Sequence, residues 1–189
     1  MANEKLLKLL YRNSFKYDPD KGFTLSSGKK SDIYVDAKKT VLTAEGIVLT
    51  GQALYEKIKN DDVQGIGGLT LGADPLAYAA ALTSNIQGKP MDVFIVRKEP
   101  KKHGTQRWIE GSLKEGAKVV VVDDVVTTGA STIKAIEAAK EAGFDVVKAL
   151  VLLDREEENG RTSIEKYCPF EALFTRTDLM AIREKLGAK

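Results

Sequence analysis

Four consecutive valines, at positions 119–122, are followed directly by Asp123 and Asp124 and then by a turn rich in Thr, Gly and Ser. A run of β-branched residues without polar alternation is typical of a strand that is buried on both faces, as central strands of a parallel sheet are. The run therefore predicts an α/β fold with both aspartates at the carboxyl end of a central strand. Ligands of such sheets bind in the crevice at that end.

The turn at residues 127–132 has the chemistry of a phosphate site. It offers backbone N–H groups, hydroxyls and the start of a helix, all of which favour an anion. Carboxylates repel phosphate, so Asp123 and Asp124 suit ribose hydroxyls or a magnesium ion carried on the phosphates. A buried strand with an ordinary polar turn is the alternative, but packing gives no reason for two adjacent acids to follow the valines. The segment predicts a sugar phosphate ligand.

The rest of the chain alternates helical and strand patterns, which calls for a parallel sheet with right-handed crossovers. Strands are expected at residues 63–66, 92–96, 118–122, 146–153 and 172–175, and helices at 6–11, 44–57, 74–84, 131–142 and 178–186. Thr43 is the expected N-cap of the second helix, and Gly143 ends the fourth. Residues 23–36 alternate in polarity around a Ser/Gly turn and predict a hairpin. We expect a single domain, with residues 1–40 as an N-terminal helix and cap on a core at 41–189.

Composition excludes several classes of function. A net charge of +2 argues against a nucleic-acid-binding surface, and no apolar stretch approaches the roughly 20 residues of a membrane span. The leucines near the N-terminus are interrupted by charges, so they predict an amphipathic helix and no signal peptide. Cys168 is the single cysteine, which excludes an internal disulfide and fits a reducing cytoplasm, and it is expected to be buried packing. His103 is the only histidine, which excludes a multi-histidine metal site.

The segment at 119–132 resembles the signature of the type I phosphoribosyltransferases: four apolar residues, two acids, two apolar residues, Thr-Thr-Gly and a small hydroxyl residue. The resemblance implies their α/β fold, a parallel central sheet flanked by helices with a small N-terminal hood, and phosphoribosyl pyrophosphate (PRPP) as substrate. Asp123 and Asp124 would hold the ribose 2′ and 3′ hydroxyls, with Asp124 also catalytic. The 5′-phosphate would be bound by Thr127, Thr128, Gly129, Ala130, Ser131 and Thr132.

A second glycine-rich turn, at residues 65–75, resembles the pyrophosphate loop of this family. Alone it is weak evidence, since a tight loop explains the glycines equally well. The resemblance implies that Thr70 and Leu71 contact PRPP, and it places a non-proline cis peptide at the Leu69–Thr70 bond.

The segment at 97–111 is strongly basic and follows an apolar strand. A solvated charged loop is the ordinary explanation, although long polar loops inside compact domains are commonly functional. Its start, Arg-Lys-Glu-Pro-Lys-Lys-His-Gly, resembles the catalytic loop of orotate phosphoribosyltransferases. The resemblance implies that Arg97, Lys98, Lys101 and His103 contact the pyrophosphate, the last three as catalytic residues. In the family this loop serves the neighbouring subunit, so a homodimer with shared active sites is implied.

Residues 23–36 resemble the N-terminal hood of the same enzymes, which selects the base. Ser26 of the hood, Thr128 and Arg155 would bind orotate, because a guanidinium can take a carboxylate through two parallel hydrogen bonds. Three glutamates follow Arg155, so a solvated charge run is the alternative. Some relatives carry lysine where Ser26 and Leu71 stand, which would shift basic contacts to Lys98, Lys101 and Lys29 or Lys30.

The resemblance as a whole implies transfer of 5-phosphoribosyl from PRPP to orotate, giving orotidine 5′-monophosphate and pyrophosphate in pyrimidine biosynthesis. Magnesium would be the cofactor, held mainly by PRPP and water, with no direct protein ligand. A cytoplasmic enzyme without nucleic-acid or membrane partners is expected. Two alternatives stay open: a phosphoribosyltransferase acting on a purine, and a non-enzymatic PRPP-sensing regulator on the same fold. The hood and the basic loop argue against both.

Overall fold

The computed structural model of the 189-residue chain describes residues 2–24, 28–99 and 108–187. Its elements within these ranges are α1 (Ala2–Ser14), β1 (Phe15–Tyr17), β2 (Phe23–Thr24), β3 (Lys30–Ser31), β4 (Ile33–Val35), α2 (Lys38–Val41), α3 (Ala44–Ile58), β5 (Gly65–Leu69), α4 (Asp74–Ile86), β6 (Asp92–Val96), β7 (Ile109–Glu110), β8 (Lys118–Val126), α5 (Ala130–Glu141), β9 (Asp145–Asp154), α6 (Gly160–Glu165), β10 (Phe170–Thr175) and α7 (Arg176–Lys185).

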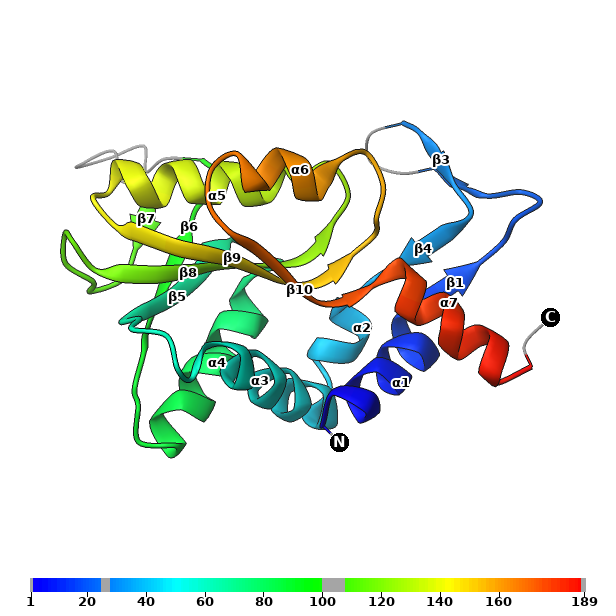
Figure 1. Cartoon of the computed structure of the whole chain (residues 1–189), viewed down its shortest axis with the longest axis horizontal. Helices are drawn as coiled ribbons and strands as arrows, with labels where there is room; N and C mark the ends of the chain where they lie inside the picture. Colours follow the sequence, from blue (N-terminus) through cyan, green and yellow to red (C-terminus); the bar gives the residue numbers. More distant parts are fainter. Residues whose placement is uncertain (1, 25–27, 100–107, 188–189) are drawn as a thin grey trace.

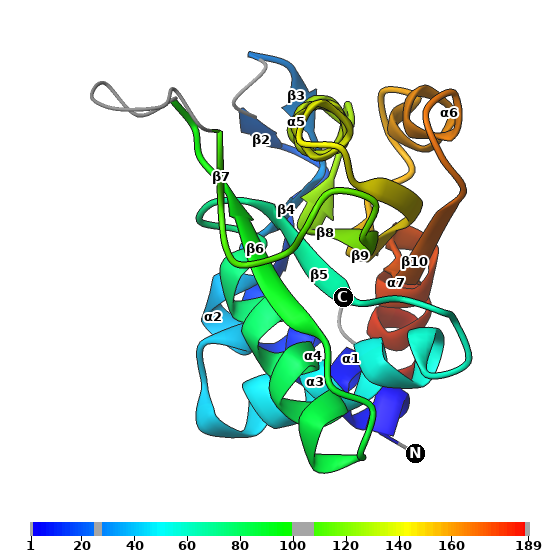
Figure 2. The same ribbon diagram turned by 90° about the vertical axis from the view of Figure 1, so that its left-hand side faces the viewer.

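The predicted parallel sheet lies at the centre of the molecule. Its described strands follow the order β10-β9-β8-β5-β6-β7, and every neighbouring pair is parallel except β6 and the short edge strand β7. Helices α5 and α6 cover one face, and α1 to α4 cover the other (Figures 1 and 2). The expected α/β class is confirmed, with β8 between β5 and β9.

Strand β8 is longer than predicted. The four valines are fully buried, as expected, but pairing continues beyond them, with Val125 opposite Leu153 and Val126 opposite Asp154. Asp123 and Asp124 therefore lie inside the strand and not after it. The long partner β9 explains the difference, because its ladder extends through both aspartates.

Strand β5 starts and ends later than predicted and runs through glycines that the sequence assigns to a turn. A Cβ at Gly67 would lie 1.9 Å from the carbonyl oxygen of Phe94, and one at Gly68 would lie 2.1 Å from that of Val122. Neighbouring backbone thus approaches too closely for a side chain, so these glycines are required by the packing around the strand.

The helix signals are mostly confirmed. Thr43 caps α3 by accepting a 3.0 Å hydrogen bond from Gly46 N, and Gly143 follows α5 with a φ of +80°. Helix α7 begins two residues earlier than predicted, because Thr175 is its N-cap and forms a capping box with Asp178.

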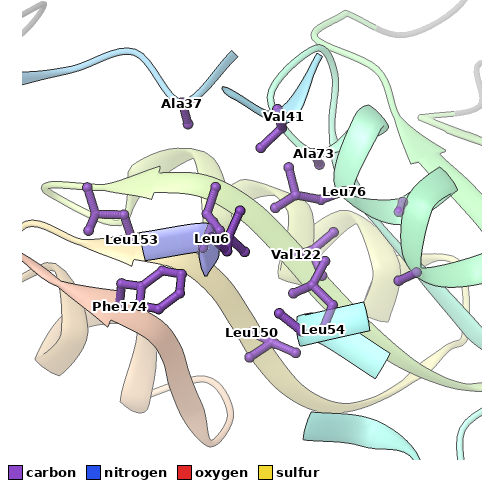
Figure 3. Close-up of a cluster of buried hydrophobic side chains, with 14 of the residues drawn as sticks. Leu6, Ala37, Val41, Leu54, Ala73, Leu76, Val122, Leu150, Leu153 and Phe174 are labelled. Atoms are coloured by element: carbon purple, nitrogen blue, oxygen red, sulfur yellow. The ribbon is translucent and has the colours of Figure 1, made fainter. Parts of the chain in front are cut away.

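The N-terminal segment pairs differently from the expected simple hairpin. Strands β2 and β3 pair as predicted, but β4 pairs with β1, a strand that the sequence analysis missed. Leu6 and Leu10 of α1 belong to the same buried cluster as Val122 and Leu150 of the sheet (Figure 3). The first forty residues are therefore attached to the core through α1 and through Ile33, Val35 and Ala37, which belong to the same cluster.

Across the described ranges, no helix has the length and apolarity that crossing a membrane requires.

Candidate active site

The side chains of the two aspartates of β8 lie on opposite faces of the sheet. Successive side chains of a strand alternate, so Asp123 lies on the α5 side with Val119 and Val121, while Asp124 lies on the side of Val120 and Val122. Both stand near the carboxyl end of the strand, where the turn to α5 begins. The diacid predicted from sequence is thus one carboxylate in each layer.

Asp123 is a buried acid that is held by hydroxyls. It is 4% exposed, and its Oδ2 accepts hydrogen bonds from Ser131 Oγ at 2.9 Å and Thr132 Oγ1 at 2.7 Å. Its Oδ1 accepts from the Asp124 N–H at 3.0 Å. Burial, and to a smaller extent the neighbouring charge of Asp124, raise its pKa to about 6, although these hydrogen bonds act to lower it.

Asp124 faces the glycine-rich loop and α2. Its Oδ1 accepts from the Val125 N–H at 2.9 Å and lies where a Cβ on Gly72 would come within 2.7 Å. Its Oδ2 lies 3.5 Å from Lys38 Nζ, which is also 3.3 Å from Asp36 Oδ1. Burial opposes the charge on Lys38, but the carboxylates of Asp124 and Asp36 outweigh that effect and raise the lysine pKa.

The turn from β8 to α5 has the backbone of an anion site. Gly129 adopts a φ of +80° and its Cβ would lie 3.0 Å from Gly160 O, so the position requires glycine. Thr128 and Ala130 are exposed, and the Ala130 N–H reaches Thr128 Oγ1 at 3.3 Å. Two of the predicted phosphate ligands, Ser131 and Thr132, turn their hydroxyls to Asp123, and Thr132 is in addition only 1% exposed, whereas Ser131 is exposed.

The glycine-rich loop contains a non-proline cis peptide, but between Thr70 and Leu71. The expected Leu69–Thr70 position is wrong by one residue. The β ladder explains this, since Leu69 still pairs with Val96 and the Thr70 N–H donates to Val96 O at 2.9 Å. Thr70 Oγ1 donates to Asp74 Oδ2 at 2.7 Å, and Leu71 is 60% exposed.

Arg155 lies under the hood. It is 4% exposed, and its Nη2 donates to Ser31 Oγ at 2.9 Å and Ile33 O at 3.0 Å and pairs with Glu157 at 3.1 Å. Its Nε is buried without a hydrogen-bond partner. The guanidinium is therefore fixed by three contacts on one nitrogen, while a donor on another edge is unsatisfied, which a native structure rarely tolerates without a ligand or water.

The start of the basic segment lies beside the glycine-rich loop. A hollow of about 440 Å³ is lined by Thr70, Ile95, Arg97, Lys98, Glu99 and Glu110. Arg97 pairs with Glu110 at 3.0 Å, and the carbonyl of Lys98 accepts from Lys134 Nζ at 2.7 Å. The structure thus brings Thr70, Arg97 and Lys98 together. The other predicted residues of this loop, Lys101 and His103, and Ser26 of the hood lie outside the described residues.

Sequence reasoning missed two charged residues of this region. Lys38 had no motif, but it follows Asp36 by two residues, at the end of the hood pattern. Glu157 was considered only as part of a possible solvated charge run after Arg155, yet it accepts a 2.7 Å hydrogen bond from Ser31 Oγ and pairs with Arg155. Only the folded hood brings these partners together.

The described groups of the site suit the binding and positioning of a ligand. Cys168 is buried, as predicted, and burial raises the pKa of its thiol, which keeps it protonated. The described site instead offers one carboxylate in each layer, an anion-binding turn and a buried arginine. These groups fit a sugar phosphate beside a planar carboxylate.

Comparison with known proteins supports the same interpretation. The family model described as "Phosphoribosyl transferase domain" matches residues 67–171. An orotate phosphoribosyltransferase of Aquifex aeolicus is 46% identical over 181 residues, covering 95% of this chain and 98% of the relative.

Solved structures are similar over nearly the whole chain. An orotate phosphoribosyltransferase of Mycobacterium tuberculosis in complex with Fe(III) dicitrate has a TM-score of 0.81 and 36% identity, covering 95% of this chain and 99% of that one. The same organism's enzyme in complex with PRPP has a TM-score of 0.75 and 32% identity, with 95% and 99% coverage.

Proposed function

The chain belongs to the orotate phosphoribosyltransferase family, and from that premise we propose which of its residues carry out the reaction. The enzyme transfers the 5-phosphoribosyl group of PRPP to orotate, giving orotidine 5′-monophosphate and pyrophosphate for pyrimidine biosynthesis. Relatives named for this activity, at 40–46% identity, favour it over a purine substrate and over a non-enzymatic regulator.

PRPP binds along the carboxyl edge of β5 and β8. Asp124 and Asp123 accept hydrogen bonds from the ribose hydroxyls. Asp124 does so at the edge of the site, and Asp123 does so beside the hydroxyls of Ser131 and Thr132. The 5′-phosphate lies on the turn from Thr127 to Ser131, where the start of α5 adds its N–H groups. Thr70 and Leu71 hold the pyrophosphate with Arg97 and Lys98. The hollow between these residues and the exposed face of the turn support this placement.

Orotate binds against Arg155, and the buried, unpartnered Nε of this residue is the observation that carries the assignment. Orotate differs from uracil by one carboxylate. A carboxylate oxygen would satisfy the Nε, and the other contacts of the guanidinium already fix its plane. Thr128, exposed on the neighbouring turn, and Ser26 of the hood complete the base site.

Catalysis relies on charge stabilisation and alignment. The bond from C1 of the ribose to the pyrophosphate oxygen breaks while a bond to the orotate ring nitrogen forms, so positive charge builds on the ribose and negative charge on the leaving group. Lys98, Lys101 and His103 stabilise the charge of the leaving group, and each such contact is stronger when water is excluded from the site. Arg155 and Asp124 hold the two reactants in line.

Magnesium supplies further stabilisation of the pyrophosphate charge when it is bound. The described residues include no group of three or more His, Cys, Asp and Glu side chains that could hold a metal by themselves. Asp123 already accepts three hydrogen bonds and Asp124 stands beside the Lys38 ammonium, so we propose that PRPP and water coordinate the ion while the two aspartates bind the ribose.

A homodimer in the cytoplasm, with loops shared between subunits, is the assembly that we propose. Helix α4 exposes Tyr78, Leu82 and Ile86 at successive turns, and Leu71 in the preceding loop is exposed as well. Their exposed fractions range from 50% to 71%. A contiguous apolar stripe that begins beside the pyrophosphate loop would bring a second copy next to this site.

The test follows the ultraviolet absorbance of orotate in the presence of PRPP and magnesium. We expect orotate to be consumed, adenine and hypoxanthine to be untouched, and the rate to fall on chelation of magnesium and recover when it is restored. Turnover of a purine without orotate would contradict the base assignment. An undiminished rate in excess chelator would contradict the magnesium proposal alone.

A further inference from the structure

Lys38 is a cation at the diacid that sequence motifs do not predict. Its Nζ lies 3.5 Å from Asp124 Oδ2 and 3.3 Å from Asp36 Oδ1. Among the ion pairs of the described residues, the one between Lys38 and Asp124 is the one that involves an aspartate of β8. The lysine side chain is 43% exposed, so its ammonium stands at the edge of the site and not beneath it.

The backbone that carries Lys38 is firmly anchored. Its neighbours Ala37, Thr40 and Val41 are fully buried, and the last belongs to the central core cluster (Figure 3). Thr40 Oγ1 lies 2.7 Å from Ser14 Oγ, which ties α2 to the end of α1. The position of the Lys38 backbone is therefore set by packing that is independent of Asp124.

Asp36 provides the second reason to assign Lys38 a definite role. Its Oδ1 is buried and has no hydrogen-bond partner, and Lys38 is the cation beside it. A buried carboxylate oxygen without a donor is costly unless a charge compensates it. Asp36 thus favours the rotamer of Lys38 that also reaches Asp124.

The charge balance of the site shows why such a lysine is useful. Burial first, and repulsion from the adjacent Asp124 second, raise the pKa of Asp123, and the two carboxylates must accept a substrate that carries several negative charges. An ammonium beside Asp124 offsets this repulsion and fixes the carboxylate that Gly72 approaches on its other side.

We propose that Lys38 is a positioning residue for PRPP, which holds the Asp124 carboxylate against Gly72 in the orientation that accepts a ribose hydroxyl and balances the charge of the diacid. Asp36 is the anchor that keeps the lysine there. This role rests on the proposed binding of PRPP at Asp124, and it concerns PRPP without involving the orotate pocket.

The experiment compares Lys38→Gln, Lys38→Arg and Asp36→Asn with Lys39→Gln as the matched control. Lys39 is the next residue of the same helix, and its exposed side chain makes no ion pair or hydrogen bond with the residues that the structure describes. PRPP binding is measured directly by calorimetry, Michaelis constants are measured for both substrates, and thermal unfolding reports folding.

We expect Lys38→Gln to weaken PRPP binding by about fivefold to twentyfold and to change the Michaelis constant for orotate less than twofold, as one to two lost charge-assisted contacts imply. Lys38→Arg should retain PRPP binding within about threefold, since it keeps the charge. Asp36→Asn should show a smaller loss in the same direction, and Lys39→Gln should match the wild type.

A pH profile separates charge balance from simple structural support. The charged groups that face Asp124 from the described elements are Asp123 on β8, and Asp36 and Lys38 around the start of α2. Without the ammonium only acids remain around the pair, so Asp123, whose pKa is raised to about 6 by burial and by the charge of Asp124, should be protonated more readily. The acid limb of kcat/KM for PRPP should then move up by about half a pH unit or more.

Equal losses in Lys38→Gln and Lys39→Gln, or an unchanged PRPP affinity and acid limb in folded Lys38→Gln, would overturn the proposal. If Lys38→Gln does not fold, Lys38→Met and Asp36→Asn provide the same comparison. Wild-type turnover of orotate in the same assay tests the proposed function separately, so a failure of one is not mistaken for a failure of the other.

Discussion

Asp123 and Asp124 are neighbours in sequence, but they differ in surroundings and therefore in chemistry. Asp123 is enclosed and clamped by Ser131 and Thr132, whereas Asp124 lies at the edge of the site beside Lys38. The pair could be found from the sequence because two acids after four valines have no packing purpose. Lys38 could not, because the partner that gives it a role is 86 residues away.

The burial of Asp123 predicts a pH-dependent cost to stability. Its pKa is about 6 in the folded protein and 3.8 in the reference state, so the folded state binds the proton more tightly between these values. Protonation of Asp123 therefore stabilises the folded state. This contribution to the free energy of unfolding, on the order of 2–3 kcal/mol, is lost as pH rises through about 6. Asn cannot ionise, so the melting temperature of Asp123→Asn relative to wild type should rise between pH 4.5 and 7.5. A difference in melting temperature between Asp123→Asn and wild type that does not vary with pH would contradict this prediction.

Arg155→Leu should raise the Michaelis constant for orotate at least tenfold and that for PRPP far less, since it removes the donor that the substrate carboxylate needs and breaks a buried pair. Arg161→Leu is the matched control. That residue pairs with the buried Asp154 at 3.2 Å, so its loss should lower the melting temperature without affecting orotate. A change below about twofold for Arg155→Leu would remove this residue from the orotate site.

At the scale of elements, the strand ends decide where the chemistry lies, and they are what the sequence predicts least well. Strand β6 was predicted to the residue, and Thr43 as the cap of α3 was correct. The ends of β5 and β8 were not, because they depend on pairing with strands that are distant in sequence. Local patterns carry no information about how far a neighbouring strand continues.

The loop from β5 to α4 provides a prediction in which two similar substitutions should act differently. A Cβ at Gly72 would press on the Asp124 carboxylate at 2.7 Å, the end of a side chain that can move. Gly72→Ala should therefore weaken PRPP binding roughly tenfold with little loss of stability, as misplacement of a binding group does.

Gly68→Ala is the comparison, because its Cβ would meet the Val122 backbone oxygen at 2.1 Å in the middle of the sheet. We expect it to lower the melting temperature severely or to prevent folding. Calorimetric PRPP binding and thermal unfolding distinguish the two variants. If the Gly72→Ala protein bound PRPP with wild-type affinity, the claim that this loop positions the Asp124 carboxylate would be wrong.

At the scale of the whole molecule, the apolar stripe of α4 predicts the assembly. Leu82→Glu places a charge on a side chain that is 64% exposed, so it should leave the folded subunit intact but dissociate a dimer that buries this stripe. Light scattering after gel filtration should give a monomer with most of the activity lost. Leu186→Glu, at a comparably exposed leucine of 55% near the C-terminus, is the control and should stay dimeric. A dimeric, active Leu82→Glu protein would place the interface elsewhere.

Several side-chain hydrogen bonds and ion pairs fasten the hood to the last third of the chain. Arg155 reaches Ser31 and Ile33 across more than 120 residues of sequence, Glu157 reaches Ser31, and Arg176 pairs with Asp32 across 144. During synthesis the hood leaves the ribosome among the first residues, whereas its partners are made near the end. At about 5–20 residues per second, it waits on the order of ten seconds for them. The proposed orotate pocket is thus among the last parts of the molecule that can form, and a nascent chain truncated before Arg155 lacks the proposed base site however well the turn from β8 to α5 has folded.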